Sequence, residues 1–174
     1  MSTTLATLIA TCAPLIHPTT LSALIHVESA ANPYAVSLNR PARLEDAGYD
    51  PATLIPRQPT TAVEAANLTR QLLRQGITTS VGLAQINIEH LPHWRHRLSD
   101  LFDPCINLQL AQAILIDCDQ TSMSATTPNA TRIRRTLSCY NTGNTRDGIT
   151  NGYVSRIHRV AAHSTPATAL LAKR

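Results

Sequence analysis

The feature that most constrains the fold is an apolar stretch between residues 105 and 118. Its apolar side chains point in nearly every direction around a helix, which is typical of a helix buried at the centre of a domain. Asp103 and Pro104 precede the stretch and match the N-cap and first position of that helix. The apolar residues of the stretch are Leu108, Leu110, Ala111, Ala113, Ile114, Leu115 and Ile116.

The composition favours a mostly α fold around this helix. Hydrophobic residues make up 43% of the 174 residues and aromatic residues only 3%, so the core consists of Leu, Ile, Val and Ala. The length fits one domain. We expect one domain over residues 1–163 and a flexible C-terminal tail over residues 164–174.

Apolar periodicity and capping signals predict the remaining elements. Residues 35–59 contain four prolines, and we expect an irregular excursion with a short β-hairpin there. The Thr61–Glu64 segment matches a capping box that opens a helix ending at Gly76. Further helices are predicted at 4–12, from an N-cap at Thr19 or Thr20 to Asn32-Pro33, and from Val154 to Ala161. Another helix is predicted to carry Ile133, Thr136, Leu137 and Tyr140 on its buried stripe and to end at Asn141 and Gly143-Asn144.

The charge excludes some classes of function. The net charge is +4 and the basic residues are scattered, which argues against nucleic-acid binding and is compatible with an acidic polymer such as a bacterial wall. No run of 18 apolar residues is present, so we expect no membrane span. Residues 1–14 lack a basic segment and make a poor signal peptide.

Four cysteines without a CxxC pair suggest two disulfides and an oxidising compartment. The alternative is four reduced, buried cysteines in a cytoplasmic protein. A continuous helix would separate Cys105 from Cys118 by roughly 20 Å, and a disulfide needs Cα atoms within about 7 Å. We therefore expect each of them to bond to Cys12 or Cys139, and the sequence leaves the order open.

The chemistry is predicted to centre on Glu28. Leu21, Leu24 and Ile25 form the apolar stripe of a helix, and Glu28 occupies the next position of that stripe. Burial there would raise the pKa of the carboxyl and keep it protonated, as a general acid requires. The alternative interpretation is that Glu28 lies at the helix end and reaches water.

Two further segments carry polar side chains among apolar ones. Gln85 and Asn87 lie in the Ser80–Asn87 segment, and a buried amide needs partners in the protein or on a polar ligand. Tyr140 completes a second stripe in the same manner as Glu28, and its alternative role is an ordinary core tyrosine. The three histidines of the His90–His96 segment are interrupted by Pro92, so we expect no metal site.

Three motifs together resemble those of lytic transglycosylases with a goose-type lysozyme fold. They are Glu28-Ser29, the Gly82–Asn87 segment GLAQIN, and the Tyr140–Asn144 segment YNTGN. They resemble the ES, GLMQIN and YNxGN motifs of that family, with Ala84 in place of the usual Met or Gly. Three further segments, Cys12-Ala13-Pro14, Phe102–Leu108 and Ser138-Cys139-Tyr140, resemble the branch that cuts the wall for type IV secretion and conjugation systems, and the match covers roughly residues 10–160.

The resemblance implies a fold, a substrate and a mechanism. The fold would be a lysozyme-like helical domain, and the substrate would be the glycan strand of peptidoglycan in the periplasm. Protonated Glu28 would act as acid and then as base, producing a 1,6-anhydromuramic end without a cofactor or metal. Ser29 and Gln85 would hold amide groups of the substrate, and Tyr140 would bond near Glu28 or the acetamido group. Asn87 and Asn141 are also candidate sugar contacts, although a structural role is the favoured interpretation for both.

Two other functions remain as alternatives. A hydrolytic lysozyme would use the same fold and acid with water as the nucleophile. A non-catalytic peptidoglycan-binding scaffold would not need a carboxylic acid on a buried stripe. Periplasmic components of a type IV secretion system are the expected protein partners under the resemblance.

Overall fold

The computed structural model describes residues 4–39, 41–93, 96–123 and 128–164. They form two compact units, one of Met1–Val27 with Gln109–Arg174 and the other of Glu28–Leu108. The first unit is helical, and the second combines helices with a small antiparallel sheet. The predicted mostly α fold with a small β excursion is confirmed. No helix among these residues is long and apolar enough to cross a membrane.

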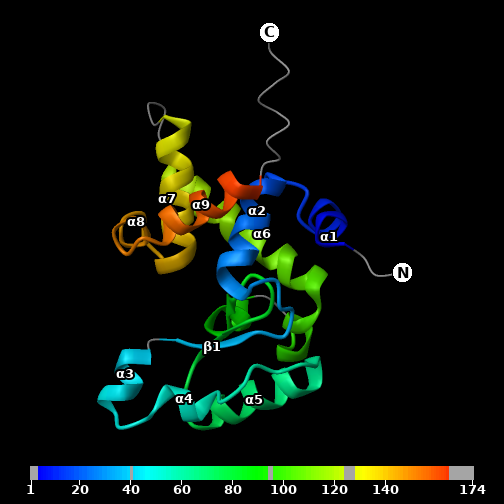
Figure 1. Cartoon of the computed structure of the whole chain (residues 1–174), viewed down its shortest axis with the longest axis vertical. Coiled ribbons are helices and arrows are strands. Elements are labelled where there is room, and N and C mark those ends of the chain that lie inside the picture. The colour runs from blue at the N-terminus through cyan, green and yellow to red at the C-terminus, as the bar shows by residue number, and fades with distance from the viewer. Residues whose placement is uncertain (1–3, 40, 94–95, 124–127, 165–174) are drawn as a thin grey trace. The chain divides into compact units, whose positions relative to one another are not determined.

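The first unit is built from helices that Figure 1 labels in chain order. Helices α7, α8 and α9 pack on one another. The loop after α1 is held by a hydrogen bond of 2.8 Å from the Leu15 main-chain N–H to the Gln112 side chain. The helices are α1 (Leu5–Cys12), α2 (Pro18–Ser29) as far as Val27, α6 (Pro104–Ser122) from Gln109 onward, α7 (Asn129–Thr142), α8 (Asp147–Thr150) and α9 (Tyr153–Ser164).

Helix α2 differs from its prediction at both ends. It begins at Pro18 rather than after an N-cap at Thr19 or Thr20, because proline is favoured in the first helical turn. It ends at Ser29, before Asn32-Pro33, and Ala30 and Ala31 follow with φ of 51° and 62°. A left-handed alanine costs about 1–2 kcal/mol. The chain therefore turns, at a cost in backbone energy, directly after Ser29.

Helix α6 begins at Pro104 as predicted, and the Asp103 carboxylate accepts from the N–H groups of Cys105 and Ile106 at 2.8 and 2.9 Å. The expectation that this helix is buried nearly all round is wrong. Leu108, Ala111 and Leu115 are buried, but Ala113 is exposed. Alanine is small enough for a solvent face, and apolar character alone did not distinguish that face from the buried one.

Helices α6 and α7 are linked at successive turns. A disulfide joins Cys118 to Cys139 with Cα atoms 5.7 Å apart. Asp119 forms an ion pair of 3.0 Å with Arg132 and accepts a hydrogen bond of 3.2 Å from Thr136. Cys12 and Cys105 are disulfide-bonded as well. The predictions that the cysteines are oxidised and that Cys105 does not pair with Cys118 are confirmed.

The end of α7 explains part of the YNTGN segment. Gly143 adopts a left-handed conformation (φ 74°) and closes the helix, as predicted. The Asn144 side chain then accepts from the N–H groups of Arg146 and Asp147, which starts α8. Gly148 packs against Ser138, whose Cα would lie 2.6 Å from a Cβ at that position. Ile133, predicted on the buried stripe of α7, is instead 46% exposed.

The second unit surrounds a three-stranded antiparallel sheet of order β1-β2-β3. Strand β1 pairs with β2 through Val36↔Val81, Ser37↔Ser80 and Leu38↔Thr79. Figure 1 labels β1, α3, α4 and α5 in this unit. Its elements are β1 (Val36–Leu38), α3 (Pro41–Asp46), α4 (Pro51–Leu54), α5 (Ala62–Arg74), β2 (Thr79–Val81), β3 (Ile86–Asn87), η1 (Ile88–His93), η2 (Leu98–Phe102) and the first turn of α6.

The excursion over residues 35–59 is more ordered than predicted. It contains the short helices α3 and α4, and its strand pairs with the distant β2 instead of forming a local hairpin. The Gln58 side chain bonds both the N–H and the C=O of Val36, at 2.9 and 3.0 Å. The side-chain amide of Gln58 thus satisfies the main-chain groups of Val36 at this edge of the sheet, as a neighbouring strand would.

Helix α5 opens with the predicted capping box, but one of its two hydrogen bonds involves the residue before the expected one. The Thr61 hydroxyl accepts from the N–H of Glu64 at 3.1 Å. The Glu64 carboxylate accepts from the N–H of Thr60 at 2.9 Å, rather than from that of Thr61. The Thr60 N–H, the Arg57 guanidinium and the Thr60 hydroxyl hold the pKa of Glu64 below its usual range. The helix ends at Arg74, and Gly76, the predicted stop, follows two residues later with φ of 74°.

Candidate functional site

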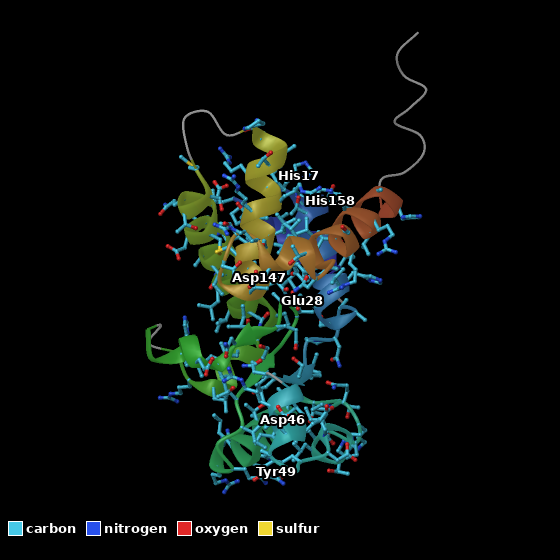
Figure 2. The ribbon with its side chains drawn as sticks, turned by 90° about the vertical axis from the view of Figure 1, so that its left-hand side faces the viewer. His17, Glu28, Asp46, Tyr49, Asp147 and His158 are labelled. Atoms are coloured by element: carbon cyan, nitrogen blue, oxygen red, sulfur yellow. A yellow bond between two sulfur atoms is a disulfide. The ribbon has the colours of Figure 1, made fainter. Side chains whose placement is uncertain are left out.

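Glu28 lies in the last turn of α2, as Figure 2 shows. Leu21, Leu24 and Ile25 of the same stripe are fully buried, while Glu28 is half-buried. The apolar stripe is therefore confirmed. Glu28, at the last position of the stripe, follows buried apolar residues and is itself partly accessible to water. A carboxyl in such a place can bind a proton and exchange it with a substrate group.

Ser29 ties the end of α2 to the turn between β2 and β3. Its hydroxyl donates a hydrogen bond of 2.7 Å to the carbonyl oxygen of Leu83. This bond joins the Glu28-Ser29 motif to the GLAQIN motif within the second unit.

Asn107 holds the same turn from the other side, and the sequence analysis did not single it out as a site residue. Its side chain is fully buried and accepts from the N–H of Ala84 at 2.8 Å. It also donates to the carbonyls of Val81 and Leu101 at 3.0 and 2.9 Å. The signal that could have found it is an asparagine inside an apolar helix, because a buried amide needs partners.

Gly82 is required by this arrangement. Its φ is 80°, and a Cβ there would lie 2.8 Å from the Leu101 carbonyl oxygen and would overlap the Asn107 amide. The first residue of the GLAQIN motif thus lets α6 and η2 approach the turn. Close packing therefore explains why the motif begins with a glycine.

Gln85 has a strained backbone, and its side-chain amide makes three hydrogen bonds. Its φ is 51°, in the left-handed region. Its Nε2 donates to the carbonyls of Gly82 and Ala35 at 2.9 and 3.2 Å, and its Oε1 accepts from the Ser37 hydroxyl at 2.6 Å. One lone pair of Oε1 remains for a further donor.

Asn87 lies in a chain of polar side chains at the edge of the sheet. Its Oδ1 accepts from Asn39 at 2.9 Å and from the N–H of Glu89 at 3.0 Å. Its Nδ2 donates to the Glu89 carboxylate at 3.0 Å, and Asn39 accepts from Ser80 at 2.8 Å. These bonds agree with the structural role that was favoured for Asn87.

Tyr140 and Asn141 belong to the first unit. Tyr140 is half-buried near the end of α7, next to Cys139 of the disulfide. Asn141 is exposed, and its Oδ1 accepts from the Asn151 side chain at 3.0 Å. The disulfide and the Gly148–Ser138 contact fix the part of α7 that carries Tyr140.

No group of three or more His, Cys, Asp or Glu side chains suited to a metal ion occurs among the described residues. The side chains of His90 and His93 and the whole of Trp94 lie outside that part. His96 is placed, 3.9 Å from Asp100. A hollow of about 320 Å³ between α5 and the Pro56–Pro59 segment contains none of the predicted site residues.

Comparison with known proteins places these observations in a family. Residues 7–156 match the family of the transglycosylase SLT domain. The chain belongs to this family. The chain is 32% identical over 161 residues, or 90% of its length, to a Brucella abortus protein named type IV secretion system protein virB1. It is 28% identical over 155 residues, or 89% of the chain, to protein virB1 of Agrobacterium fabrum.

The chain spans 62% of the length of the Brucella protein and 58% of the Agrobacterium protein. No solved structure matches it. The match agrees with the resemblance inferred from the three motifs, and all three lie inside residues 7–156.

Proposed function

We propose that this SLT domain is a lytic transglycosylase that cleaves the β-1,4 bond between N-acetylmuramic acid and N-acetylglucosamine in peptidoglycan. The observation that carries the proposal is the position of Glu28, half-buried at the end of a fully apolar stripe and adjacent to the Ser29–Leu83 bond. Membership of the transglycosylase SLT family supports the same activity.

Glu28 acts twice in the proposed mechanism. Its protonated carboxyl gives a proton to the glycosidic oxygen as the bond from the muramic anomeric carbon breaks. The substrate's acetamido group stabilises the cationic carbon, as in other substrate-assisted glycosidases. The Glu28 carboxylate then takes the proton of the muramic 6-hydroxyl, whose oxygen attacks the anomeric carbon. The product carries a 1,6-anhydro end, and Glu28 is protonated again.

The surrounding residues bind and orient the sugars. The Ser29 hydroxyl donates to the Leu83 carbonyl, and we propose that Ser29 also helps to hold an amide group of the substrate. Gln85 offers the remaining lone pair of Oε1 to an amide N–H of the substrate. Tyr140 is proposed to hydrogen-bond the acetamido group through its phenol. Asn87 and Asn141 are proposed to support the binding surface through their bonds to Glu89 and Asn151.

The biological setting is proposed from the relatives. The Brucella relative is named a type IV secretion system protein. We propose that this domain opens the wall locally for such a system, in the periplasm and next to periplasmic components of the machinery. Two disulfide-bonded cysteine pairs in one short chain support an oxidising compartment.

The proposed acid is tested by clearing of purified sacculi, followed as loss of turbidity. The Glu28→Gln variant should lose at least about a hundredfold in rate, because the amide cannot transfer the proton. Glu45→Gln, a change of the same kind at an exposed position of α3, should clear at the parent rate. Persistent clearing by the Glu28→Gln variant would overturn the assignment of the acid.

A further inference from the structure

The charges of this chain are unevenly distributed along its sequence. Residues 128–164 contain six arginines and a single carboxylate, Asp147. Helix α9, which Figure 2 marks at His158, has no acidic residue. The C-terminal part of the first unit is therefore strongly basic, although the net charge of the whole chain is only +4.

Helix α9 has one buried face and one basic face. Tyr153, Val154 and Ile157 are nearly fully buried. The exposed side chains on the opposite face include Arg156, His158, Arg159 and His163, which we call the basic face of α9. Positions 156, 159 and 163 follow the spacing of one helical stripe and extend over about 10 Å at 1.5 Å per residue.

Within the described part of the chain, neither Arg156 nor Arg159 takes part in an ion pair. Arg156 is oriented by the Tyr153 ring, 5.8 Å from its guanidinium carbon, and by a long contact of 3.5 Å to the Asn151 carbonyl. Most of its N–H groups therefore remain available to an external anion.

Two acids of the first unit are already engaged. Asp147 accepts from the Asn144 side chain at 2.8 Å, and Asp119 pairs with Arg132 at 3.0 Å. An exposed row of cations with no internal counter-charge attracts anionic polymers and makes their binding sensitive to salt.

We propose that the basic face of α9 is a second peptidoglycan-binding surface that takes the carboxylates of the stem peptides. This inference rests on the proposed function. The face carries none of the residues proposed to cut the glycan or to bind it for cutting. A weak ionic contact at a second point of the same polymer raises the effective concentration of the glycan at the first. The partner is thus the substrate polymer itself.

Co-sedimentation with sacculi tests the proposal in the Glu28→Gln background, where cutting is suppressed. The double variant Arg156→Gln/Arg159→Gln should bind about tenfold more weakly at low salt and should show a smaller loss of binding as salt is added. The matched control is Arg70→Gln/Arg74→Gln, which removes two exposed arginines from α5 and should bind within twofold of the parent.

Changing the wall instead of the protein gives an independent measurement. Sacculi whose carboxylates have been converted to amides should bind the parent as weakly as native sacculi bind the Arg156→Gln/Arg159→Gln variant. If Arg156→Gln disturbs folding through Tyr153, the single Arg159→Glu variant serves in its place.

Three results would overturn the proposal. One is equal binding of the two double variants to native sacculi, and another is undiminished binding of the parent to amidated sacculi. The third is arginine-dependent binding to vesicles of anionic phospholipid without arginine-dependent binding to sacculi, which would assign the face to a membrane surface. Because binding is measured in an inactive variant, failure of the catalytic proposal would appear separately, as absence of cleavage by the parent.

Discussion

The side-chain oxygen of Asn107 accepts a hydrogen bond of 2.8 Å from the main-chain N–H of Ala84, inside the GLAQIN motif. Through this bond and two donated ones, the first turn of α6 fixes the turn that receives Ser29. The position of Glu28 within the second unit therefore depends on a residue that is not expected to touch the substrate.

Replacing Asn107 by alanine is predicted to lower the free energy of unfolding by about 3 kcal/mol. It would leave the Ala84 N–H and the Val81 and Leu101 carbonyls buried without their partner, and such groups cost about 1–3 kcal/mol each. Chemical denaturation measures the change. Asn67→Ala, at an exposed position of α5, should stay within about 0.5 kcal/mol of the parent. A loss below about 1 kcal/mol for Asn107→Ala would show that the turn holds without it.

Gly82 is required for a steric reason that can be measured separately from the effect of its backbone conformation. Gly82 and Gly48 have similar φ, 80° and 84°, but only Gly82 faces other atoms at its Cβ position. Gly48→Ala should cost about 1 kcal/mol for the left-handed backbone. Gly82→Ala should cost at least about 2 kcal/mol more, from the clash with Leu101 and Asn107. Equal losses of stability for the two variants in thermal unfolding would argue against a close approach of Leu101 and Asn107 to Gly82.

Thr79 is predicted to be a site of stabilisation. Its hydroxyl is fully buried in β2 and has no hydrogen-bond partner among the described residues. Thr79→Val removes an unsatisfied polar group with little change of shape, and should raise the free energy of unfolding by about 1 kcal/mol. Thr69→Val is the control, since the equally buried Thr69 hydroxyl donates 2.8 Å to the Ala65 carbonyl. It should gain clearly less, and a net loss for Thr79→Val would contradict the prediction.

The cap of α5 should make stability depend on pH in the acidic range. The pKa of Glu64 in the folded protein is lowered, first by the N–H of Thr60 and then by Arg57. Its contribution is thus fully present above the ordinary value of 4.5 and is lost as the pH falls through the folded pKa. The stability difference between the parent and Glu64→Gln should be constant above about pH 5.5 and shrink below pH 4.5. A difference independent of pH down to pH 3 would be the opposite result.

Local signals in the sequence predicted much of the fold. Asp103-Pro104, Thr61 with Glu64, and Gly143 mark helix ends because their effect lies within one turn. The pairing of Val36 with Val81 joins residues 45 positions apart, and no local pattern encodes it. The two alanines after Ser29 adopt a left-handed backbone conformation that alanine disfavours, and only tertiary contacts can impose it.

In the candidate site, too, local signals predicted some residues, and the contacts that depend on the fold were not predicted. Glu28 was found because a carboxylate interrupts an apolar stripe, and the motifs pointed to Ser29, Gln85 and Tyr140. The partners of these residues were not predictable, because Leu83, Ser37 and Asn107 meet them only through the fold. The exposure of Ile133 was likewise missed, because periodicity assigns a face to a helix without saying how far the neighbouring elements extend.

Mass spectrometry of the muropeptides released from purified sacculi tests the central claim most directly. The account predicts products with 1,6-anhydromuramic ends from the parent and none from the Glu28→Gln variant, since the same carboxyl serves as acid and base. Reducing ends, heavier by one water, would contradict it and identify a hydrolytic lysozyme. Intact sacculi that retain the bound parent protein would contradict it as well, and would make the domain a wall-binding scaffold.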